Sequence, residues 1–309
     1  MPRTETQHRP VLAVDLGGTK MIIAVISADG RILARERCLT LSEEGPQPVI
    51  TRLFAAIDVI LGRQEMSPSQ LYGICIGAAG IIDIKRGRLV SGPHLPGWSD
   101  LPLRDTVEEK YGIPSFLLND ASAAALGEHR YGAGQGTKDL VLLTVGTGIG
   151  GGIIVNGRLY QGAAGAAGEI GHMTIDVNGT RDICGNTGCL ETLVSGTAIA
   201  AEVRRRLENG EKSSLREMAN GRLGDITAEM VNAAARSRDA LALEAISRMG
   251  TCLGAGLVSM VNIFNPEMII IGGGVAAMGD MLLEPARRVV AERAFSLPAR
   301  LVSLVPARL

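Results

Sequence analysis

The sequence predicts an α/β protein built from two related halves, each with a glycine-rich hairpin. Its 309 residues are 46% hydrophobic, which is enough for a large core divided between two domains. Short aliphatic runs alternate with amphipathic stretches, as is typical of layered α/β folds. There are 40 glycines, many of them in short loops directly after aliphatic runs. Loops of this kind bring backbone close to a ligand.

The first half reads as a strand meander followed by alternating helices and strands. Residues 11–15, 21–27 and 31–41 are expected strands, joined by turns at LGGTK and ADG. Apolar residues at helical spacing predict an amphipathic helix over 46–62. Further strands are expected in 71–80 and 114–120, and further helices over 101–112 and 121–131.

The opening pattern returns at residue 140. LVLLTVGTGIGGGIIVNGRLY repeats the order strand, glycine–threonine loop, strand and turn of LAVDLGGTKMIIAVISADGRIL, which indicates a degenerate internal repeat. Two such halves would face each other across a cleft. Helical stretches follow over roughly 196–209 and 227–262, and MIIIGGGVA is a late buried strand with a third glycine loop.

Composition excludes several classes of protein. A net charge of −1 without basic blocks gives no footprint for nucleic acid or an anionic membrane surface. No run approaches the roughly 18 apolar residues that span a membrane, and the N-terminus lacks a signal-peptide segment. Of the five cysteines, Cys38, Cys75 and Cys252 are expected in the core, which argues against a disulfide framework. We therefore expect a cytoplasmic protein with reduced thiols and no nucleic-acid or membrane partner.

The glycine loops favour phosphate binding over a dinucleotide fold. GTGIGG (146–151) matches G-x-G-x-x-G by letter, but that motif needs a helix after the loop, and here a strand is expected. No G-x-x-x-x-G-K-[ST] occurs either. Backbone N–H groups, the Thr19 and Thr147 hydroxyls and the charge of Lys20 would form anion-binding concavities. The alternative is that the glycines serve only tight turns; three loops, two of them in a repeated context, favour nucleotide binding.

Six motifs, taken in order, resemble the ROK family of sugar kinases in the actin-like ATPase superfamily: DLGGTK, LLNDASAAALGE, TVGTGIGGGI, EIGH, CGNTGCLE and IIIGGGVA. The resemblance runs from about residue 11 to the C-terminus. It implies two actin-like (ribonuclease H-like) α/β domains around a central cleft, which we place at 1–119 and 120–309, the second with a zinc loop. It also implies ATP-dependent phosphorylation of a hexose, with Mg²⁺, a structural Zn²⁺ and a homodimer or homotetramer. Only ten residues precede Val11, so we do not expect the winged helix of the family's repressors.

The resemblance also implies roles for individual residues. Asp120 would be the catalytic base, and Glu191 would hold the anomeric end of the sugar. The expected sugar-binding residues are Gly80, Asn119, Asp120, Glu169, His172 and Glu191. The expected ATP- and Mg²⁺-side residues are Asp15, Gly17, Gly18, Thr19, Lys20, Thr147, Gly148, Gly273 and Gly274. The expected zinc ligands are His172, Asp182, Cys184 and Cys189.

The two aspartates at strand ends have reasons of their own to be in a site. Asp120 stands where a strand meets a helix, so the helix dipole would keep it ionised. Because the transition state of phosphoryl transfer is loose, a carboxylate that accepts and orients the hydroxyl suffices. The alternative is that Asn119 and Asp120 only cap the helix. Asp15 ends a buried strand beside the first glycine turn and would lie on the Mg²⁺ side, or else bond the turn's own N–H groups.

Three departures from the family pattern bear on the site. The family's C-x-C-G-x-x-G-C-x-E begins here with Asp182, which keeps the ligand charge and offers a shorter bond (Zn–O roughly 2.0–2.2 Å against 2.3 Å for Zn–S). In such a site zinc would fix the loop and orient His172. The alternative is an empty site with two free thiols in a glycine turn. His94 replaces an asparagine of NLPGW, so the sugar preference would depend on packing around His94 and Gly80. The chain ends at LVSLVPARL, where relatives usually continue into a small-residue helix.

These features predict a kinase for the 6-hydroxyl of a hexose, with glucose as the first-choice acceptor. An N-acetylmannosamine or N-acetylglucosamine kinase is the closest alternative. A non-catalytic sugar sensor of the same family should lack the base, and Asp120 is present. A filament-forming or chaperone-type ATPase would not need Glu169, His172 and Glu191 together.

Overall fold

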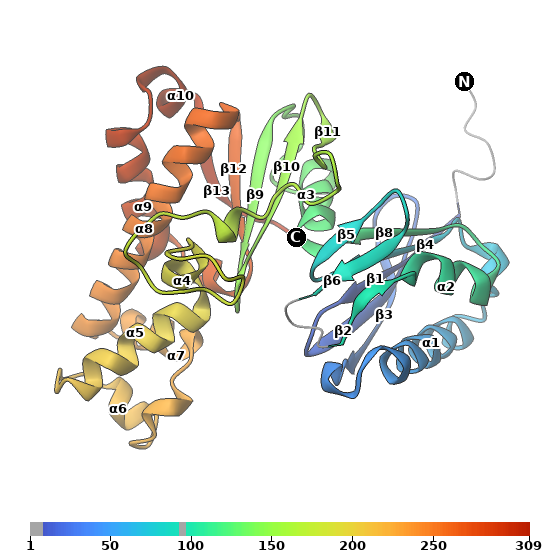
Figure 1. Cartoon of the computed structure of the whole chain (residues 1–309), viewed down its shortest axis with the longest axis horizontal. Helices are drawn as coiled ribbons and strands as arrows, with labels where there is room; N and C mark the ends of the chain where they lie inside the picture. The colour runs from blue at the N-terminus through green and yellow to red at the C-terminus, as the bar shows by residue number, and fades with distance from the viewer. Residues whose placement is uncertain (1–8, 93–96) are drawn as a thin grey trace. The chain divides into compact units, whose positions relative to one another are not determined.

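The computed structural model describes residues 9–92 and 97–309, and the chain divides into two compact units (Figure 1). Unit 1 comprises Met1–Ala123 and Gln161–Ala167, and unit 2 comprises Ala124–Tyr160 and Gly168–Leu309. The division falls inside helix α3 (Asp120–Tyr131), slightly after the boundary expected between residues 119 and 120. No motif or composition change in the sequence indicates that 161–167 belongs to unit 1. That each unit is an independently folding domain stays a prediction.

Unit 1 has eight described strands and two helices before α3. The strands are β1 (Val11–Leu16), β2 (Lys20–Ile26), β3 (Ile32–Leu39), β4 (Ile74–Ala78), β5 (Ile81–Asp83), β6 (Arg88–Ser91), β7 (Ser99–Leu101) and β8 (Ser115–Asn119), and the helices are α1 (Pro46–Arg63) and α2 (Leu103–Tyr111). Strands β5, β6 and β7 form a small sheet that we had not predicted.

Unit 2 is richer in helix. Its described strands are β9 (Leu140–Val145), β10 (Ile149–Val155), β11 (Arg158–Leu159), β12 (Met268–Gly272) and β13 (Ser303–Pro306). Its helices after α3 are α4 (Glu191–Val194), α5 (Gly196–Glu208), α6 (Leu215–Met218), α7 (Ala228–Arg236), α8 (Ala240–Phe264), α9 (Asp280–Arg293) and α10 (Ser296–Leu301), with 3₁₀ turns at η4 (Ile170–His172) and η6 (Gly274–Met278).

The main sheets of the two units share one topology. Among the described residues, the strand order is β3-β2-β1-β4-β8 in unit 1 and β11-β10-β9-β12-β13 in unit 2. In both sheets the first three strands are antiparallel neighbours, and the last two run parallel to the strand in the middle. This common design agrees with the internal repeat predicted from the sequence. Strand β10 begins inside GTGIGG, so a strand follows this loop as predicted and the dinucleotide interpretation fails.

Apolar patterning accounts for the cores. Helix α1 starts at Pro46, whose ring suits the first helical position, and buries a stripe that includes Val49, Leu53 and Ile57 against the unit 1 sheet. In unit 2, alternate residues of β9 point into two clusters. Val141 and Leu143 join the larger one with α5, α7, α8 and α9, whereas Leu140 and Leu142 join a smaller one with α3. Both faces of this sheet are therefore buried, which explains its unbroken aliphatic runs.

Helix α8 changes two expectations. By length and composition it is apolar enough to cross a membrane, contrary to the expectation that no run would be. However, 56% of its most apolar window is buried, and a Cβ at Gly250 would lie 2.4 Å from the carbonyl oxygen of Leu282 in α9. It is therefore packed as a core helix of unit 2. The stretch expected over 227–262 is in fact two helices, separated where Arg238 takes φ 65° and Asp239 caps α8.

Candidate active site and metal centre

Predicted site residues of unit 1 follow the carboxyl ends of neighbouring parallel strands. Strands β1, β4 and β8 lie side by side, and Ala78 at the end of β4 pairs with Asn119 at the end of β8. The turn 17–20 follows β1, Gly80 follows β4 and Asp120 follows β8. Ligand sites of open α/β sheets form at this edge. Unit 1 thus brings together the predicted phosphate turn, Gly80 and the Asn–Asp pair.

The charge of Asp120 acts on Asp15 at this edge. Desolvation by the surrounding chain and then the charge of Asp120 raise the pKa of Asp15, while Lys20 and Arg35 lower it. The side chain of Asp15 is nevertheless accessible to solvent, so the expectation of a buried acid is wrong. Two carboxylates that repel each other next to a lysine form a donor set that suits a hydrated Mg²⁺ and its phosphate ligands.

Asn119 and Asp120 both bond the start of α3. Asn119 Oδ1 accepts from the N–H of Ser122 (3.0 Å), and its Nδ2 donates to the carbonyl oxygen of Gly80 (3.1 Å). Asp120 Oδ1 accepts from the N–H of Ala121 (2.8 Å). Asn119 therefore caps helix α3, as the alternative interpretation expected. The bond that Asp120 makes to the helix uses only its Oδ1. A capping role and a catalytic role for Asp120 are compatible.

Gly80 is fixed as a glycine by its surroundings. Its φ is +130°, and a Cβ there would lie 2.3 Å from the carbonyl oxygen of Ser91. Any side chain at this position would force the backbone after β6 to move. His94, the other residue expected to shape the sugar pocket, lies outside the described residues.

In unit 2 the third glycine loop packs against the end of β9, the strand that leads into the second glycine loop. The turn 146–148 after β9 is closed by the N–H of Gly146, which donates to the carbonyl oxygen of Gly148 (2.8 Å). Gly273, after the parallel neighbour β12, has φ +84°, and a Cβ there would lie 2.4 Å from the carbonyl oxygen of Val145. The four predicted nucleotide residues of this unit therefore belong to one edge of one sheet.

The start of helix α5 adds residues that we had not predicted. Gly196 N–H donates to the carbonyl oxygen of Gly146 (2.7 Å), and Thr197 Oγ1 donates to that of Thr147 (2.9 Å). Ser195 caps the helix by accepting from the N–H of Ala198. A helix N-terminus beside a glycine turn favours anionic ligands. The serine cap before a helical run was the signal in the sequence that could have pointed here.

Glu191 connects the predicted sugar residues to the predicted phosphate turn. It is the first residue of α4, and its Oε2 accepts from the N–H of Ile149 (2.5 Å). A Cβ at Gly148 would lie 2.3 Å from the same oxygen, so the carboxylate packs directly on the turn.

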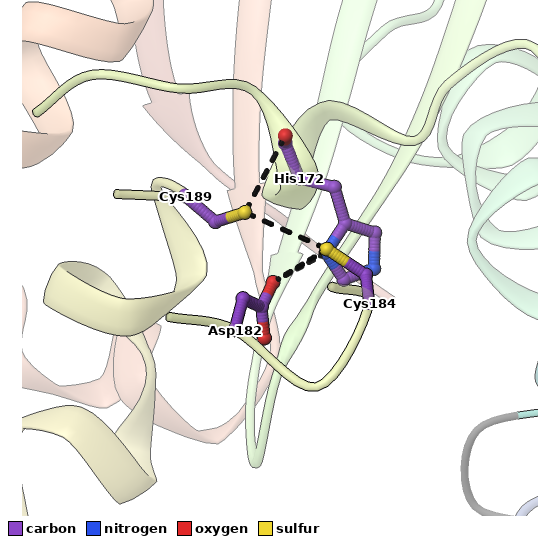
Figure 2. A group of neighbouring side chains, drawn as sticks. All are labelled: His172, Asp182, Cys184 and Cys189. Atoms are coloured by element: carbon purple, nitrogen blue, oxygen red, sulfur yellow. Dashed lines mark hydrogen bonds and ion pairs between the residues drawn. The ribbon is translucent and has the colours of Figure 1, made fainter. Parts of the chain in front are cut away.

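The four predicted zinc ligands lie together in unit 2 (Figure 2). One ligand atom from each of His172, Asp182, Cys184 and Cys189 lies within 4.8 Å of the others. The segment from Thr174 to Cys189, which carries three of the four, is closed by an antiparallel bridge between its two ends, and His172 lies just before it.

The distances within this cluster suit a tetrahedral ion. Two thiolates bound at about 2.3 Å to zinc lie about 3.8 Å apart, and the sulfurs of Cys184 and Cys189 are 3.7 Å apart. Asp182 Oδ2 lies 2.8 Å from His172 Nδ1 and 3.1 Å from Cys184 Sγ, which are hydrogen-bond distances that a bound ion would lengthen slightly. The donor set fits Zn²⁺, and its occupancy stays a prediction.

The protonation of the cluster is set by these contacts. Desolvation opposes the charge of Asp182, but donors from Cys189, Cys184 and His172 lower its pKa to about 2. Desolvation, followed by the bond to Asp182, raises the pKa of Cys189 to about 12. The sulfur of Cys189 therefore stays a thiol unless a cation displaces its proton. The remaining cysteines, Cys38, Cys75 and Cys252, are half-buried rather than fully in the core.

His172 presents its two nitrogens to different neighbours. Nδ1 faces Asp182 in the cluster, and Nε2 lies 4.0 Å from Oε2 of Glu169. The imidazole of His172 therefore lies between Glu169, a predicted sugar-binding residue, and Asp182, a predicted metal ligand.

Comparison with known proteins shows the family and the fold of the chain. The family model for the ROK family matches residues 11–309. A glucokinase of Halalkalibacterium halodurans is 38% identical over 93% of this chain and 86% of its own length. A putative xylose repressor of Caldicellulosiruptor sp. is 33% identical over 92% of this chain and 71% of its own. A ROK family glucokinase from Streptomyces griseus, solved with glucose and AMPPNP, is 33% identical with a TM-score of 0.85 over 97% of this chain and 95% of its own. The predicted actin-like α/β fold is confirmed.

Proposed function

Because this chain belongs to the ROK family, we propose that it is an ATP-dependent hexose kinase that transfers phosphate to the 6-hydroxyl of glucose. The observation that carries the proposal is the position of Asp120 at the carboxyl edge of the unit 1 sheet, beside Asp15 and the 17–20 turn. The kinase relatives and the glucose-bound neighbour support the reaction class. A cytoplasmic location and a homodimer or homotetramer remain predictions.

In the proposed mechanism Asp120 orients the sugar. Its Oδ1 is engaged by the N–H of Ala121, so Oδ2 would accept the 6-hydroxyl proton. Glu169, His172 and Glu191 would bind other sugar hydroxyls and hold the acceptor in position. Positioning of this kind supplies most of the catalysis in phosphoryl transfer, since little covalent chemistry falls to the protein.

The nucleotide would be held by backbone. The N–H groups of the 17–20 and 146–148 turns, the Thr19 and Thr147 hydroxyls and Lys20 would contact the phosphates, and Gly273 and Gly274 would border the adenosine. Mg²⁺, when bound on the Asp15 side, neutralises charge on the phosphates. Zinc in the His172 cluster would fix the loop and take no part in transfer.

An ADP-release assay tests the proposal with glucose, mannose, fructose, N-acetylglucosamine and N-acetylmannosamine as acceptors. Asp120→Asn keeps the Oδ1 that bonds Ala121 but removes the base, so kcat should fall by about 100-fold or more. Asp105→Asn, at an exposed position on α2, is the matched control and should keep its turnover. Equal turnover in the two variants would remove Asp120 from the mechanism.

A sugar sensor without turnover is the second candidate, because a putative xylose repressor is 33% identical over most of this chain. A sensor would bind one of these sugars and release no ADP with any of them. Preference for an N-acetylated hexosamine would instead identify an amino-sugar kinase.

A further inference from the structure

Glu191 belongs to two predicted sites of unit 2. It begins α4, two residues after the predicted zinc ligand Cys189, and the proposed function counts it among the sugar-binding residues. Its carboxylate lies against the 146–148 turn, where the proposed function puts the ATP phosphates.

The contact with the turn is close and specific. Oε2 of Glu191 accepts from the N–H of Ile149 (2.5 Å), the first residue after the turn. A Cβ on Gly148 would lie 2.3 Å from Oε2 and 2.9 Å from Cδ, so this glycine leaves only enough room for the carboxylate. By contrast, a Cβ on Gly146 in the same turn would have no atom within 4 Å.

The other side of the turn is held by the helix that follows Glu191. The N–H of Ser195 donates to the carbonyl oxygen of Glu191 (3.2 Å), and the next residue, Gly196, donates to the carbonyl oxygen of Gly146 (2.7 Å). Any shift of Glu191 therefore reaches the turn both through its side chain and through α4 and α5. A carboxylate accepts about four hydrogen bonds, so the bond to Ile149 leaves acceptor capacity for sugar hydroxyls.

From this geometry we propose that Glu191 couples sugar binding to nucleotide binding. A sugar hydroxyl bonded to Glu191 fixes the carboxylate, and the fixed carboxylate holds the N–H of Ile149 and the turn in the shape that receives phosphate. Binding coupling is reciprocal, so the nucleotide strengthens sugar binding by the same factor. The proposal rests on the proposed kinase function of the same site.

Calorimetric titration of the full chain tests the coupling. Glucose is titrated with and without saturating AMPPNP and Mg²⁺, and AMPPNP is titrated with and without glucose. We expect each ligand to lower the Kd of the other by about fivefold or more, within the usual range for coupled sites. In Gly148→Ala, the methyl group displaces the carboxylate, so the two Kd values should become nearly independent and glucose alone should bind more weakly.

Gly224→Ala is the matched control, because it adds the same methyl group within unit 2, outside the predicted site and with no neighbour to displace. It should keep the wild-type coupling factor and the wild-type Kd for glucose alone. The proposal is overturned if wild-type glucose affinity ignores AMPPNP, if Gly148→Ala keeps full coupling, or if both glycine variants lose it equally. Failure of the kinase proposal looks different, since no hexose would then release ADP, and the coupling proposal would fall with it.

Discussion

Glu128 carries a sharp prediction about stability. Its side chain is 2% exposed on α3, and its two oxygens are occupied by backbone. Oε2 accepts from the N–H of Ala133 (2.7 Å), and Oε1 accepts from the N–H groups of Arg308 (2.8 Å) and Leu309 (2.7 Å). A buried carboxylate therefore ties the last residues of the chain to the helix that begins at Asp120.

Glu128→Gln keeps the shape and replaces one acceptor by a donor. If the amide N–H₂ takes the place of Oε2, it faces the N–H of Ala133 and that bond is lost. The two bonds from Arg308 and Leu309 then go to a neutral amide oxygen instead of a charged carboxylate. Bonds to a charged group contribute about 1.5–3 kcal/mol each, and a stranded buried donor costs about 1–3 kcal/mol. Relief from burying a charge offsets part of this loss. We expect unfolding to become easier by about 2–3 kcal/mol, which lowers the Tm of a unit of this size by about 5–10 °C.

Scanning calorimetry and urea unfolding measure the change. Glu292→Gln, at an exposed position on α9, is the control and should shift the free energy of unfolding by no more than about 0.5 kcal/mol. Arg308→Pro deletes one of the three N–H donors, whereas Arg308→Ala keeps it. The proline variant should be the less stable of the two, and its effect should not add to that of Glu128→Gln. Full additivity, or equal stability of the Glu128 and Glu292 variants, would refute the reasoning.

Two further predictions concern α8 and the metal cluster. Desolvation opposes the charge of Asp239, but the N–H of Ala242 and further donors lower its pKa below 3.8, so its stabilising effect is present above that pH and is lost as pH falls through the folded value. Asp239→Asn should therefore unfold more easily than wild type in urea at pH 7, and the two should converge as the pH falls below 3.8 through the folded pKa of Asp239. Cys184→Ser should lose zinc, measured by elemental analysis, and raise KM for sugar through His172, whereas Cys252→Ser, outside the cluster, should do neither. Metal loss with unchanged sugar affinity would contradict the second prediction.

Most strands could be predicted because their signal is local. The aliphatic runs of β1 and β4 are buried in adjacent strands of one sheet and those of β9 and β12 in adjacent strands of the other. A glycine follows each strand within two residues and marks the turn. The break before α8 was missed because apolar residues continue at helical spacing across it. Asp239 before an apolar run was the available signal, and it is the cap that starts α8. The sheet of β5, β6 and β7 was missed because its strands are three or four residues long.

For the candidate site, too, the local features could be predicted from the sequence and the long-range contacts could not. Asn119 and Asp120, like the 17–20 and 146–148 turns, lie within single strand–turn motifs, so the sequence was enough to place them at the edge of a sheet. The contacts of those turns were beyond the sequence. The N–H of Ile149 reaches Glu191, and the hydroxyl of Thr197 reaches Thr147, across more than forty residues. In each pair one partner is a backbone group, which has no sequence signal, so such pairs appear only once the tertiary structure is known.

The predicted link between zinc and sugar affinity depends on which nitrogen of His172 carries the proton. A neutral imidazole has one donor and one acceptor nitrogen. If Nδ1 binds metal in the cluster, Nε2 must carry the proton, so it donates beside Glu169 Oε2 at 4.0 Å, and the pair offers a sugar one donor and one acceptor. If Nδ1–H instead donates to Asp182 at 2.8 Å, Nε2 becomes an acceptor and the pair offers two acceptors. Metal at Nδ1 would therefore turn Nε2 of His172 from an acceptor into a donor toward the predicted sugar. Because Asp120 is untouched by that reversal, loss of zinc should appear in KM for sugar far more than in kcat.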